Sequence, residues 1–476
     1  MKTQHIKKLE GFTGTLLIPV YETHSKSVLP IEFHGVEVPS RVFHGKKDTF
    51  YVVEKYDCTH VFIGIGKDTD YNSLKKIFRR IASKQKDYLV KSTALVIPEN
   101  FSNKQTEASI SGLILGTYEL GHFKKIDKHV FLAEDFILGL LSKQDYSEAA
   151  ERASKIANAQ LQVYNLVDLP PNVVTPEYLA NWAVASGKKF GFATEILNKE
   201  TAAAAGLEAF LSVGKGSDKE PQFIIMNYVP ENADAKTKHV GFVGKGITFD
   251  TGGLNIKTAG MLHMKCDMAG GGAVLGAMQL IADLKLPVKV TAIVPACENA
   301  VDSKAFLPSD VIRSYSGHSI EIIDTDAEGR LILADGLSYL IQNFNPEIII
   351  DIATLTGSSV GTFGYECAAL FTNNDEISKK LQQAGDEIGE RLWPLPLWDA
   401  YKSDIESDIA DVKNYSGKPV AGAISAAKFL EFFTKEHKAW AHLDVAGVAF
   451  GDDEFAKSKH ATAYGVHLLT TFIETL

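Results

Sequence analysis

The chain has 476 residues, 45% of them hydrophobic and 23% charged, and a formal net charge of -10 at pH 7. A chain of this length exceeds one ordinary hydrophobic core and predicts two domains. The acidic balance argues against a nucleic-acid-binding protein. Four cysteines without close spacing argue against a disulfide framework or a cysteine zinc site.

The sequence contains no run of 18 apolar residues, which excludes an ordinary membrane-spanning helix. The first 20 residues include Glu10 and lack the long apolar segment of a secretory signal peptide. Together with the sparse cysteines, these features predict a cytoplasmic protein that does not bind a membrane.

The first 150 residues alternate short strand-like and helix-like stretches. Strands are predicted at 13–20, 60–65 and 94–97, and helices at 71–81 and 109–120. No cluster of chemically active side chains stands out in this part of the sequence. We therefore predict a smaller N-terminal α/β domain over residues 1–150.

A connecting helix is predicted next, because residues 147–167 are rich in Ala, Glu and Gln with apolar residues at helical spacing. The two prolines at 170 and 171 interrupt this pattern. We expect a connecting helix and linker over 151–172, followed by a larger domain over 173–476.

Strand-like runs alternate with helical patterns throughout this larger domain. The runs lie at 223–228, 240–243, 288–294, 320–323 and 348–352, and the helical patterns at 269–284, 331–343 and 421–434. This alternation predicts a mostly parallel sheet covered by helices on both faces.

Residues 324–331 place three acids, Asp324, Asp326 and Glu328, at alternate positions between a predicted strand and a predicted helix. On an extended backbone, alternate side chains point to one face, so the three carboxylates can converge. In open α/β sheets such loops lie at the carboxyl ends of the strands, where ligands bind. Three like charges this close repel unless a cation neutralises them, so a divalent metal is the natural partner.

A second candidate cluster follows the strand at 240–243. Residues 244–253 contain four glycines, which indicate a backbone that turns tightly or is closely approached. Lys245 and Asp250 lie inside this loop, and Lys257 and Asp267 follow it. Taken singly, each is more often a turn residue or an ion-pair partner. The glycines lack the spacing of a nucleotide-binding loop.

Both clusters resemble the signatures of the leucyl aminopeptidase family, the dinuclear cytosol aminopeptidases. The matching stretches, in the family's order and spanning about 165–450, are 169–172, 244–253, 264–268, 325–331, 353–357, 421–430 and 440–447. The resemblance implies that residues 173–476 form a catalytic metallopeptidase domain. It also implies a homohexamer that removes N-terminal neutral or hydrophobic residues from peptide substrates.

Two departures from the family pattern lie beside the expected metals. Family members usually carry Asn where this chain has Asp324, and the segment from Lys257 to Asp267 is one residue shorter here. The first departure adds a negative charge, and the second is expected to alter a loop lining the substrate pocket. Neither removes an expected metal ligand.

The resemblance assigns ligands for two divalent ions, Zn²⁺ or Mn²⁺, with Mg²⁺ as a further option. It implies that Asp250 and Glu328 bridge both ions, that Asp326 belongs mainly to one, and that Lys245 and Asp267 belong to the other. Two such ions activate a shared water and clamp the reacting oxygens. A lysine ligates only as the neutral amine, which requires a strongly lowered pKa; on sequence alone, an ion pair is the favoured interpretation of Lys245.

The resemblance also assigns two catalytic cations and a substrate pocket. It implies that Lys257 polarises the substrate carbonyl and that Arg330 holds a bicarbonate ion that relays a proton, a planar anion that suits the guanidinium fork. Without the resemblance, Arg330 could simply neutralise the acids. The implied substrate-binding residues are Met264, Thr354, Leu355, Thr356 and Gly357.

Two alternative functions remain open at this stage. One is a regulatory or binding protein on the same scaffold, against which the full ligand set and the acidic balance argue. The other is a different metallohydrolase, which would use histidine ligands. None of the 14 histidines forms HExxH, and only His239, His263 and His318 come near the acidic clusters in sequence.

Overall fold

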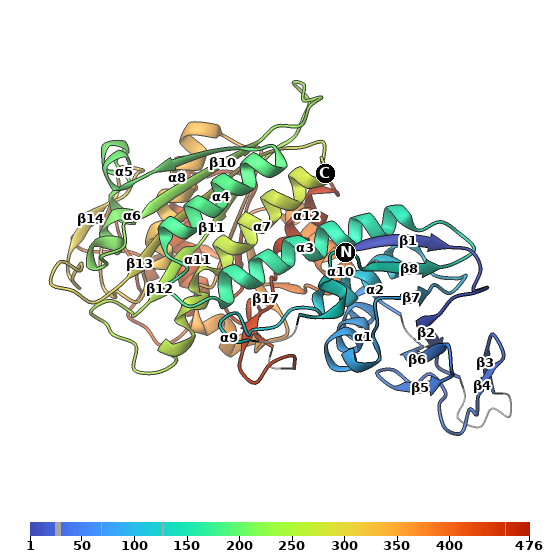
Figure 1. The fold of residues 1–476 in the computed structure, drawn as a ribbon. Coiled ribbons are helices and arrows are strands. Elements are labelled where there is room, and N and C mark those ends of the chain that lie inside the picture. The colour runs from blue at the N-terminus through green and yellow to red at the C-terminus, as the bar shows by residue number, and fades with distance from the viewer. Residues whose placement is uncertain (24–29, 68, 126–127, 453) are drawn as a thin grey trace. The chain divides into compact units, whose positions relative to one another are not determined.

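The computed structural model describes residues 1–476 apart from 24–29, 68, 126–127 and 453. The chain divides into two compact units, Met1–Leu161 and Gln162–Leu476 (Figure 1). The division falls inside helix α3 (Ser147–Asp168), whose predicted range was 147–167. The functional boundaries at 150 and 172 stay predictions.

The first unit is built on a six-stranded sheet. Its strands, in sheet order, are β1 (Lys2–Ile6), β8 (Ile137–Leu141), β7 (Thr93–Val96), β2 (Gly14–Tyr21), β6 (Cys58–Gly66) and β5 (Phe50–Glu54). All neighbours are parallel except β5 and β6. The three predicted strands of this unit are confirmed to within two residues at each end.

Helices α1 (Tyr71–Lys84) and α2 (Asn103–Leu115) pack against each other in this unit. The prediction for α2, 109–120, was wrong by six residues at the start. The helix begins at a capping box in which Ser102 and Gln105 exchange side-chain and backbone hydrogen bonds, and it ends before Gly116. The polar first turns concealed this start, because only the later residues carry the apolar pattern.

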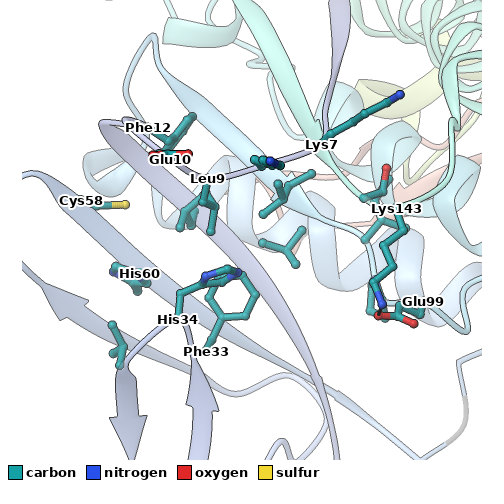
Figure 2. Close-up of a pocket in the computed structure, with 18 of the residues that line it drawn as sticks. Lys7, Leu9, Glu10, Phe12, Phe33, His34, Cys58, His60, Glu99 and Lys143 are labelled. Atoms are coloured by element: carbon teal, nitrogen blue, oxygen red, sulfur yellow. Dashed lines mark ion pairs between the residues drawn. The ribbon is translucent and has the colours of Figure 1, made fainter.

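One face of this sheet carries an apolar cluster that includes Leu16, Phe62 and Ala94. A hairpin of β3 (Ile31–Phe33) and β4 (Val36–Val38), which the sequence pattern did not predict, packs against it. A cavity lies beside this cluster (Figure 2).

The second unit is built on a nine-stranded sheet. Along the sheet its strands are β18 (Leu392–Pro394), β17 (Ala368–Thr372), β20 (Trp440–Asp444), β16 (Ile348–Ala353), β11 (His239–Gly244), β13 (Lys289–Asn299), β10 (Gln222–Tyr228) and β9 (Ala193–Leu197), with β12 (Gly246–Asp250) beside β13. The four central strands β20, β16, β11 and β13 are mutually parallel, and antiparallel pairs occur at β17–β20, β13–β10 and β10–β9. The predicted α/β fold with a mostly parallel sheet is confirmed.

Helices cover both faces of this sheet, as predicted. Gly241 of β11 faces Leu340 of α8 (Gly329–Phe344), whereas Gly244, on the other face, meets Val274 of α7 (Ala269–Asp283). A Cβ added at either glycine would lie less than 3.0 Å from Leu340 or Val274. Both helices can therefore approach the strand closely only because glycine has no side chain. The remaining helices of the unit are α4 (Pro176–Phe190), α5 (Lys199–Ala205), α6 (Glu208–Val213), α9 (Gly357–Phe363), α10 (Asp375–Ile388), α11 (Gly422–Phe432) and α12 (Val466–Ile473).

The predicted strand at 320–323 differs from the structure. It is β15 (Ser319–Glu321), which belongs to a separate three-stranded sheet with β14 (Val311–Arg313) and β19 (Val412–Lys413). The acid loop therefore enters from this small sheet and continues into α8 of the main layer. Among the described residues, no helix has the length and apolar character needed to cross a membrane.

Candidate metal centre

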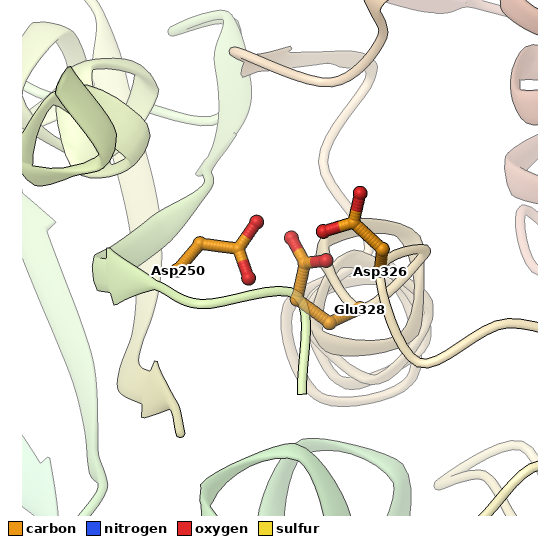
Figure 3. Close-up of side chains that lie close together, drawn as sticks. All are labelled: Asp250, Asp326 and Glu328. Carbon is orange, nitrogen blue, oxygen red and sulfur yellow. The ribbon is translucent and has the colours of Figure 1, made fainter. Parts of the chain in front are cut away.

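Three carboxylates converge in the second unit. Asp250 ends β12, while Asp326 and Glu328 lie in the loop before α8, and one oxygen from each lies within 4.8 Å of the others (Figure 3). Asp250 and Glu328 are buried, whereas the Asp326 side chain is 34% exposed. Asp324, the third acid of the predicted loop, is not part of this group.

The electrostatics of this group favour a bound cation. Burial and the neighbouring carboxylates Asp250 and Glu328 raise the pKa of Asp326 to about 7. Burial also raises the pKa of Glu328 and of nearby Asp267. Glu328 Oε2 and Asp267 Oδ2 are buried with no hydrogen-bond partner among the described residues. Unpaired carboxylate oxygens and raised pKa values are what a cluster of oxygen ligands shows where a divalent ion fits.

Lys245 connects Glu328 to Asp267. Its Nζ lies 2.8 Å from Glu328 Oε1, 2.9 Å from Asp267 Oδ1 and 3.0 Å from the carbonyl oxygen of Thr354. Burial opposes a charge on Lys245, but Asp267, Glu328 and Asp250 outweigh it and raise its pKa above the usual value. In this arrangement Lys245 is an ion-pair partner, so its service as a ligand requires that an arriving cation displace its proton.

Lys257 pairs with the other two carboxylates of the group, Asp250 and Asp326. Its Nζ is 2.8 Å from Asp250 Oδ2 and 2.5 Å from Asp326 Oδ1, and its side chain is 17% exposed. Burial opposes its charge, but Asp250 and Glu328 raise its pKa above the usual value. Lys257 is therefore a fixed, charged group at the accessible edge of the site.

Two glycines make this crowding possible. Gly252 has a φ of +88°, and a Cβ there would lie 2.9 Å from Asp326 Oδ1. A Cβ at Gly329 would lie 2.5 Å from Lys245 Nζ. A side chain at either position would displace a charged group of the site, which explains the glycine-rich sequence around the acids.

Asn299, the last residue of β13, was missed by the sequence analysis. Its Nδ2 donates to Asp250 Oδ1 at 2.8 Å and to the carbonyl oxygen of Thr325 at 3.0 Å, and its side chain is buried. It therefore fixes the orientation of Asp250 and ties β12 to the acid loop. Its position at the end of a mostly apolar strand was the only signal in the sequence.

Arg330 lies in the first turn of α8 and is buried. Its Nη1 donates to the carbonyl oxygen of Asn414 at 2.7 Å, and its Nε has no partner among the described residues. Burial lowers its pKa to about 10, which leaves it charged at neutral pH. Asn414, also missed by the sequence analysis, receives the backbone N–H groups of Ile323 and Asp324 on its Oδ1 and so holds the start of the acid loop.

The predicted substrate-binding residues lie mainly in the loop between β16 and α9. Thr354 is buried and donates to Asp267 Oδ1 at 2.9 Å, so it supports the metal site directly. Leu355 N–H and Thr356 Oγ1 donate to the two oxygens of Asp444, at 3.2 and 2.6 Å. Asp444 therefore holds this loop in place. A Cβ at Gly357 would meet nothing within 4 Å, so this end of the loop borders open space.

Met264, the remaining predicted substrate-binding residue, lies in the short helix Met261–Met268 that also carries Asp267. It is partly exposed, unlike the buried Met268. This exposure is compatible with a substrate contact, and the role itself stays a prediction.

Comparison with known proteins identifies the family to which this site belongs. The sequence model described as "Cytosol aminopeptidase family, catalytic domain" matches residues 162–470, which is almost the whole second unit. The chain belongs to the cytosol aminopeptidase family. The predicted resemblance to the leucyl aminopeptidases is confirmed, and the predicted enzyme class, a metallo-exopeptidase, is the class of this family.

Curated relatives agree with this assignment. A probable cytosol aminopeptidase of Chloroherpeton thalassium is 45% identical over 339 residues, which are 71% of this chain and 66% of the relative. A probable cytosol aminopeptidase of Chlorobium phaeobacteroides is 38% identical over 432 residues, covering 87% of this chain and 85% of the relative. Among solved structures, the bottromycin maturation enzyme BotP in complex with Mn is 25% identical, with a TM-score of 0.84 over 97% of this chain and 99% of that one.

Asp324, where this cytosol aminopeptidase family member departs from the family pattern, turns back onto its own loop. Its Oδ1 accepts the N–H of Asp326 at 2.8 Å. The extended-backbone argument predicted that Asp324 could converge with Asp326 and Glu328, and the turn at 325–326 prevents this. Asp324 therefore supports Asp326 through the backbone.

The three histidines nearest the acids in sequence do not join the carboxylate group. His239 Nε2 lies 2.9 Å from Thr291 Oγ1, and His318 Nδ1 lies 2.9 Å from Ser316 Oγ. The ring of His263 packs near Phe450. These contacts remove the support for a histidine-ligated metallohydrolase.

Proposed function

We propose that the chain is a two-metal aminopeptidase that hydrolyses N-terminal, preferentially neutral or hydrophobic, residues from peptides. The main observation in support of this proposal is the convergence of Asp250, Asp326 and Glu328. Among the described residues, one buried carboxylate oxygen of Glu328 and one of nearby Asp267 have no hydrogen-bond partner. Membership of the cytosol aminopeptidase family supports the reaction class. No observation favours a purely regulatory role on this scaffold.

The chemistry of the donor set suits two divalent cations. Asp250, Asp326, Glu328 and Asp267, with Lys245 as the neutral amine, would hold the ions. Oxygen-rich donors suit Mn²⁺ or Mg²⁺, and the amine extends the set to Zn²⁺. The Mn bound by BotP supports manganese here. When bound, the ions would supply an activated water and polarise the scissile carbonyl.

Lys257 is proposed as the catalytic cation for the substrate carbonyl oxygen. It is charged and fixed by two carboxylates, and it lies at the accessible edge of the group. A positioned cation stabilises negative charge that develops on that oxygen, by about 2.7–4 kcal/mol by analogy with oxyanion-hole donors. The Lys257 side chain need not move to reach this position, because Asp250 and Asp326 already hold its ammonium group.

Arg330 is proposed to bind a bicarbonate ion that relays a proton. One edge of its guanidinium is engaged by Asn414, while its buried Nε lacks a partner among the described residues. A planar oxyanion would satisfy that donor in the fork geometry that guanidinium groups favour. The electrostatic interaction of Arg330 with Glu328, two residues earlier, supports a relay beside the carboxylates.

The substrate would bind with its free amine on one metal and its first side chain near Met264, Leu355, Thr356 and Gly357, backed by Thr354. Recognition of the free amine at this site would restrict cleavage to N-termini. The open space beside Gly357 and the partial exposure of Met264 and Leu355 support an apolar pocket for that side chain. A cytoplasmic location is proposed from the names of the relatives.

Activity on a panel of aminoacyl fluorogenic amides tests this function. We expect hydrolysis of leucyl and methionyl amides, abolition by a chelator, and recovery on adding Mn²⁺ or Zn²⁺. N-acetylated substrates are the matched control, because acetylation removes the amine that a metal must bind. Cleavage of acetylated substrates at the same rate, or activity that survives complete chelation, would refute the proposal.

Replacing Asp324 with Asn is expected to weaken metal binding about 3- to 10-fold, because the charge is lost while an amide oxygen can still accept the Asp326 N–H. The acid limb of the kcat/KM profile should shift to lower pH, since a negative charge raises the pKa of neighbouring acids. Isothermal titration with Mn²⁺ and a pH profile measure the two effects. Unchanged values for both would show that Asp324 acts only on the backbone.

We also propose a homohexamer, on the family resemblance alone. Light scattering coupled to size-exclusion chromatography should give about six times the chain mass of 52.0 kDa. A fully active monomer would contradict this assembly.

A further inference from the structure

The first unit holds a cavity of about 930 Å³ that is lined only by residues of that unit (Figure 2). Strands β2, β6 and β7 contribute Leu16, His60 and Val96 to its lining. The segment after β1 contributes Leu9 and Phe12, and the β3–β4 hairpin contributes Phe33, His34 and Val36. Its volume and largely apolar, aromatic lining are those of small-molecule sites in proteins.

The lining of this cavity includes a buried imidazole, one nitrogen of which has no hydrogen-bond partner among the described residues. His60 is 5% exposed, and its Nδ1 has no hydrogen-bond partner among the described residues. Burial lowers the pKa of His60, so the ring is neutral at pH 7. The ring lies near Phe62, with centroids 6.5 Å apart. A buried polar nitrogen without a partner is costly, and a polar group of a ligand would remove that cost once the ring turns to present this nitrogen to the cavity.

The hairpin holds a second imidazole in a rare backbone conformation at the same cavity. His34 has a φ of +46° and precedes Gly35, whose φ is +72°. A tight hairpin of this kind is most often made by Asn-Gly, and histidine is among the non-glycine residues that tolerate positive φ. The ring of His34 packs edge-on against Phe33, with centroids 4.6 Å apart. The hairpin thus contributes the rings of Phe33 and His34 to the lining of the cavity.

The polar rim carries an excess of cations. Four lysines (Lys7, Lys8, Lys55 and Lys143) face three acids (Glu10, Asp57 and Glu99) around the cavity. Lys143 and Glu99 form an ion pair (Figure 2), with Nζ 2.7 Å from Oε1. The three remaining lysines outnumber the two remaining acids, so the rim favours an anionic group.

We propose that this cavity binds a small aromatic carboxylate, with its ring among Phe12, Phe33 and His34 and its carboxylate at the lysine rim. A polar substituent on the ligand, or the carboxylate itself, would meet His60. The site is separate from the carboxylate group of Asp250, Asp326 and Glu328, which belongs to the other unit. Binding therefore does not depend on the proposed peptidase function.

Isothermal titration of the full chain with three matched probes tests this site. We expect 4-phenylbutyrate to bind at least about tenfold more tightly than 4-phenylbutanol or 4-phenylbutylamine, which share its ring and chain but lack the anion. Glu328→Gln should bind it equally, because that residue lies in the other unit. Equal affinity for the three probes, or loss of binding in Glu328→Gln, would overturn the proposal.

Variants of the lining locate the binding. We expect His60→Phe, which keeps an aromatic ring but removes the unpaired nitrogen, and Lys7→Ala/Lys8→Ala each to weaken 4-phenylbutyrate binding several-fold. His34→Asn keeps a residue that tolerates positive φ, so it removes the ring while the turn is retained. Lys76→Ala, on the exposed side of α1 and outside the lining, is the control. Unchanged affinity in the two histidine variants, with native melting temperatures, would refute the site.

Discussion

Replacing Asp250 with Asn or Glu328 with Gln is expected to abolish tight metal binding and to lower kcat/KM by about a thousandfold or more. Both carboxylates are buried in the converging group and are proposed to hold the two ions. Losing one of these charges should weaken the binding of both ions. The several kcal/mol by which bound ions stabilise charge in the transition state would be lost with them. Metal analysis by mass spectrometry and steady-state kinetics on a leucyl amide measure the two effects.

These amide variants also separate loss of metal from loss of folding. Burial and the neighbouring carboxylate of Asp250 raise the pKa of Glu328, so its ionised form opposes folding at neutral pH. Removing one negative charge should leave the melting temperature in chelator unchanged or slightly higher. Glu406→Ala, an exposed acid of the same unit, is the matched control. Variants that retain two ions per chain would contradict the proposed ligand role.

Replacing Lys257 with Ala is expected to lower kcat about 10²–10³-fold while the metal content stays at the wild-type level. The ammonium group neutralises Asp250 and Asp326 in the described arrangement but is not an expected ligand. Its removal leaves both carboxylates free for cations, so metal affinity should not fall. Arg330→Ala should behave in the same way, because its side chain bonds Asn414 and none of the acids.

The division of roles is tested by plotting activity against metal content for all four variants. Lys304→Ala, at an exposed position, controls for the loss of a lysine in the same unit. Added bicarbonate should not restore the activity of Arg330→Ala, since the residue proposed to hold that ion is gone. Loss of metal in Lys257→Ala and Arg330→Ala to the same extent as in the carboxylate variants would show that all four residues build the site.

The ligand candidates could be predicted from the sequence because they lie in two short, chemically unusual segments. The crowded acids drew attention to Glu328 and the glycine-rich loop to Asp250, whereas the ligand role of Lys245 came only from the family resemblance, because an ion pair was favoured from the sequence alone. The residues that orient them could not be found in this way. Asn299 bonds Asp250 from 49 positions away, and Asn414 bonds Arg330 from 84 positions away. Such contacts depend on strand order, which local patterns do not contain.

The fold shows the same limit. Buried central strands such as β11 and β16 read as continuous apolar runs and were predicted almost to the residue. The start of α2 was missed because a polar capping box, not an apolar residue, defines it. Asp324 was placed on an extended backbone, but its own carboxylate bends the loop by accepting the Asp326 N–H. Periodicity predicts which residues are buried more reliably than it predicts turns.

The most direct test of the two-metal proposal is the number of divalent ions bound by the fully active protein. After removal of loosely held metal, quantitative mass spectrometry should find two ions per chain, and stepwise removal of either should abolish hydrolysis of leucyl amide. A fully active protein that holds one ion or none would contradict the proposal, because the carboxylates around Asp250 and Glu328 would then not be needed to bind two ions.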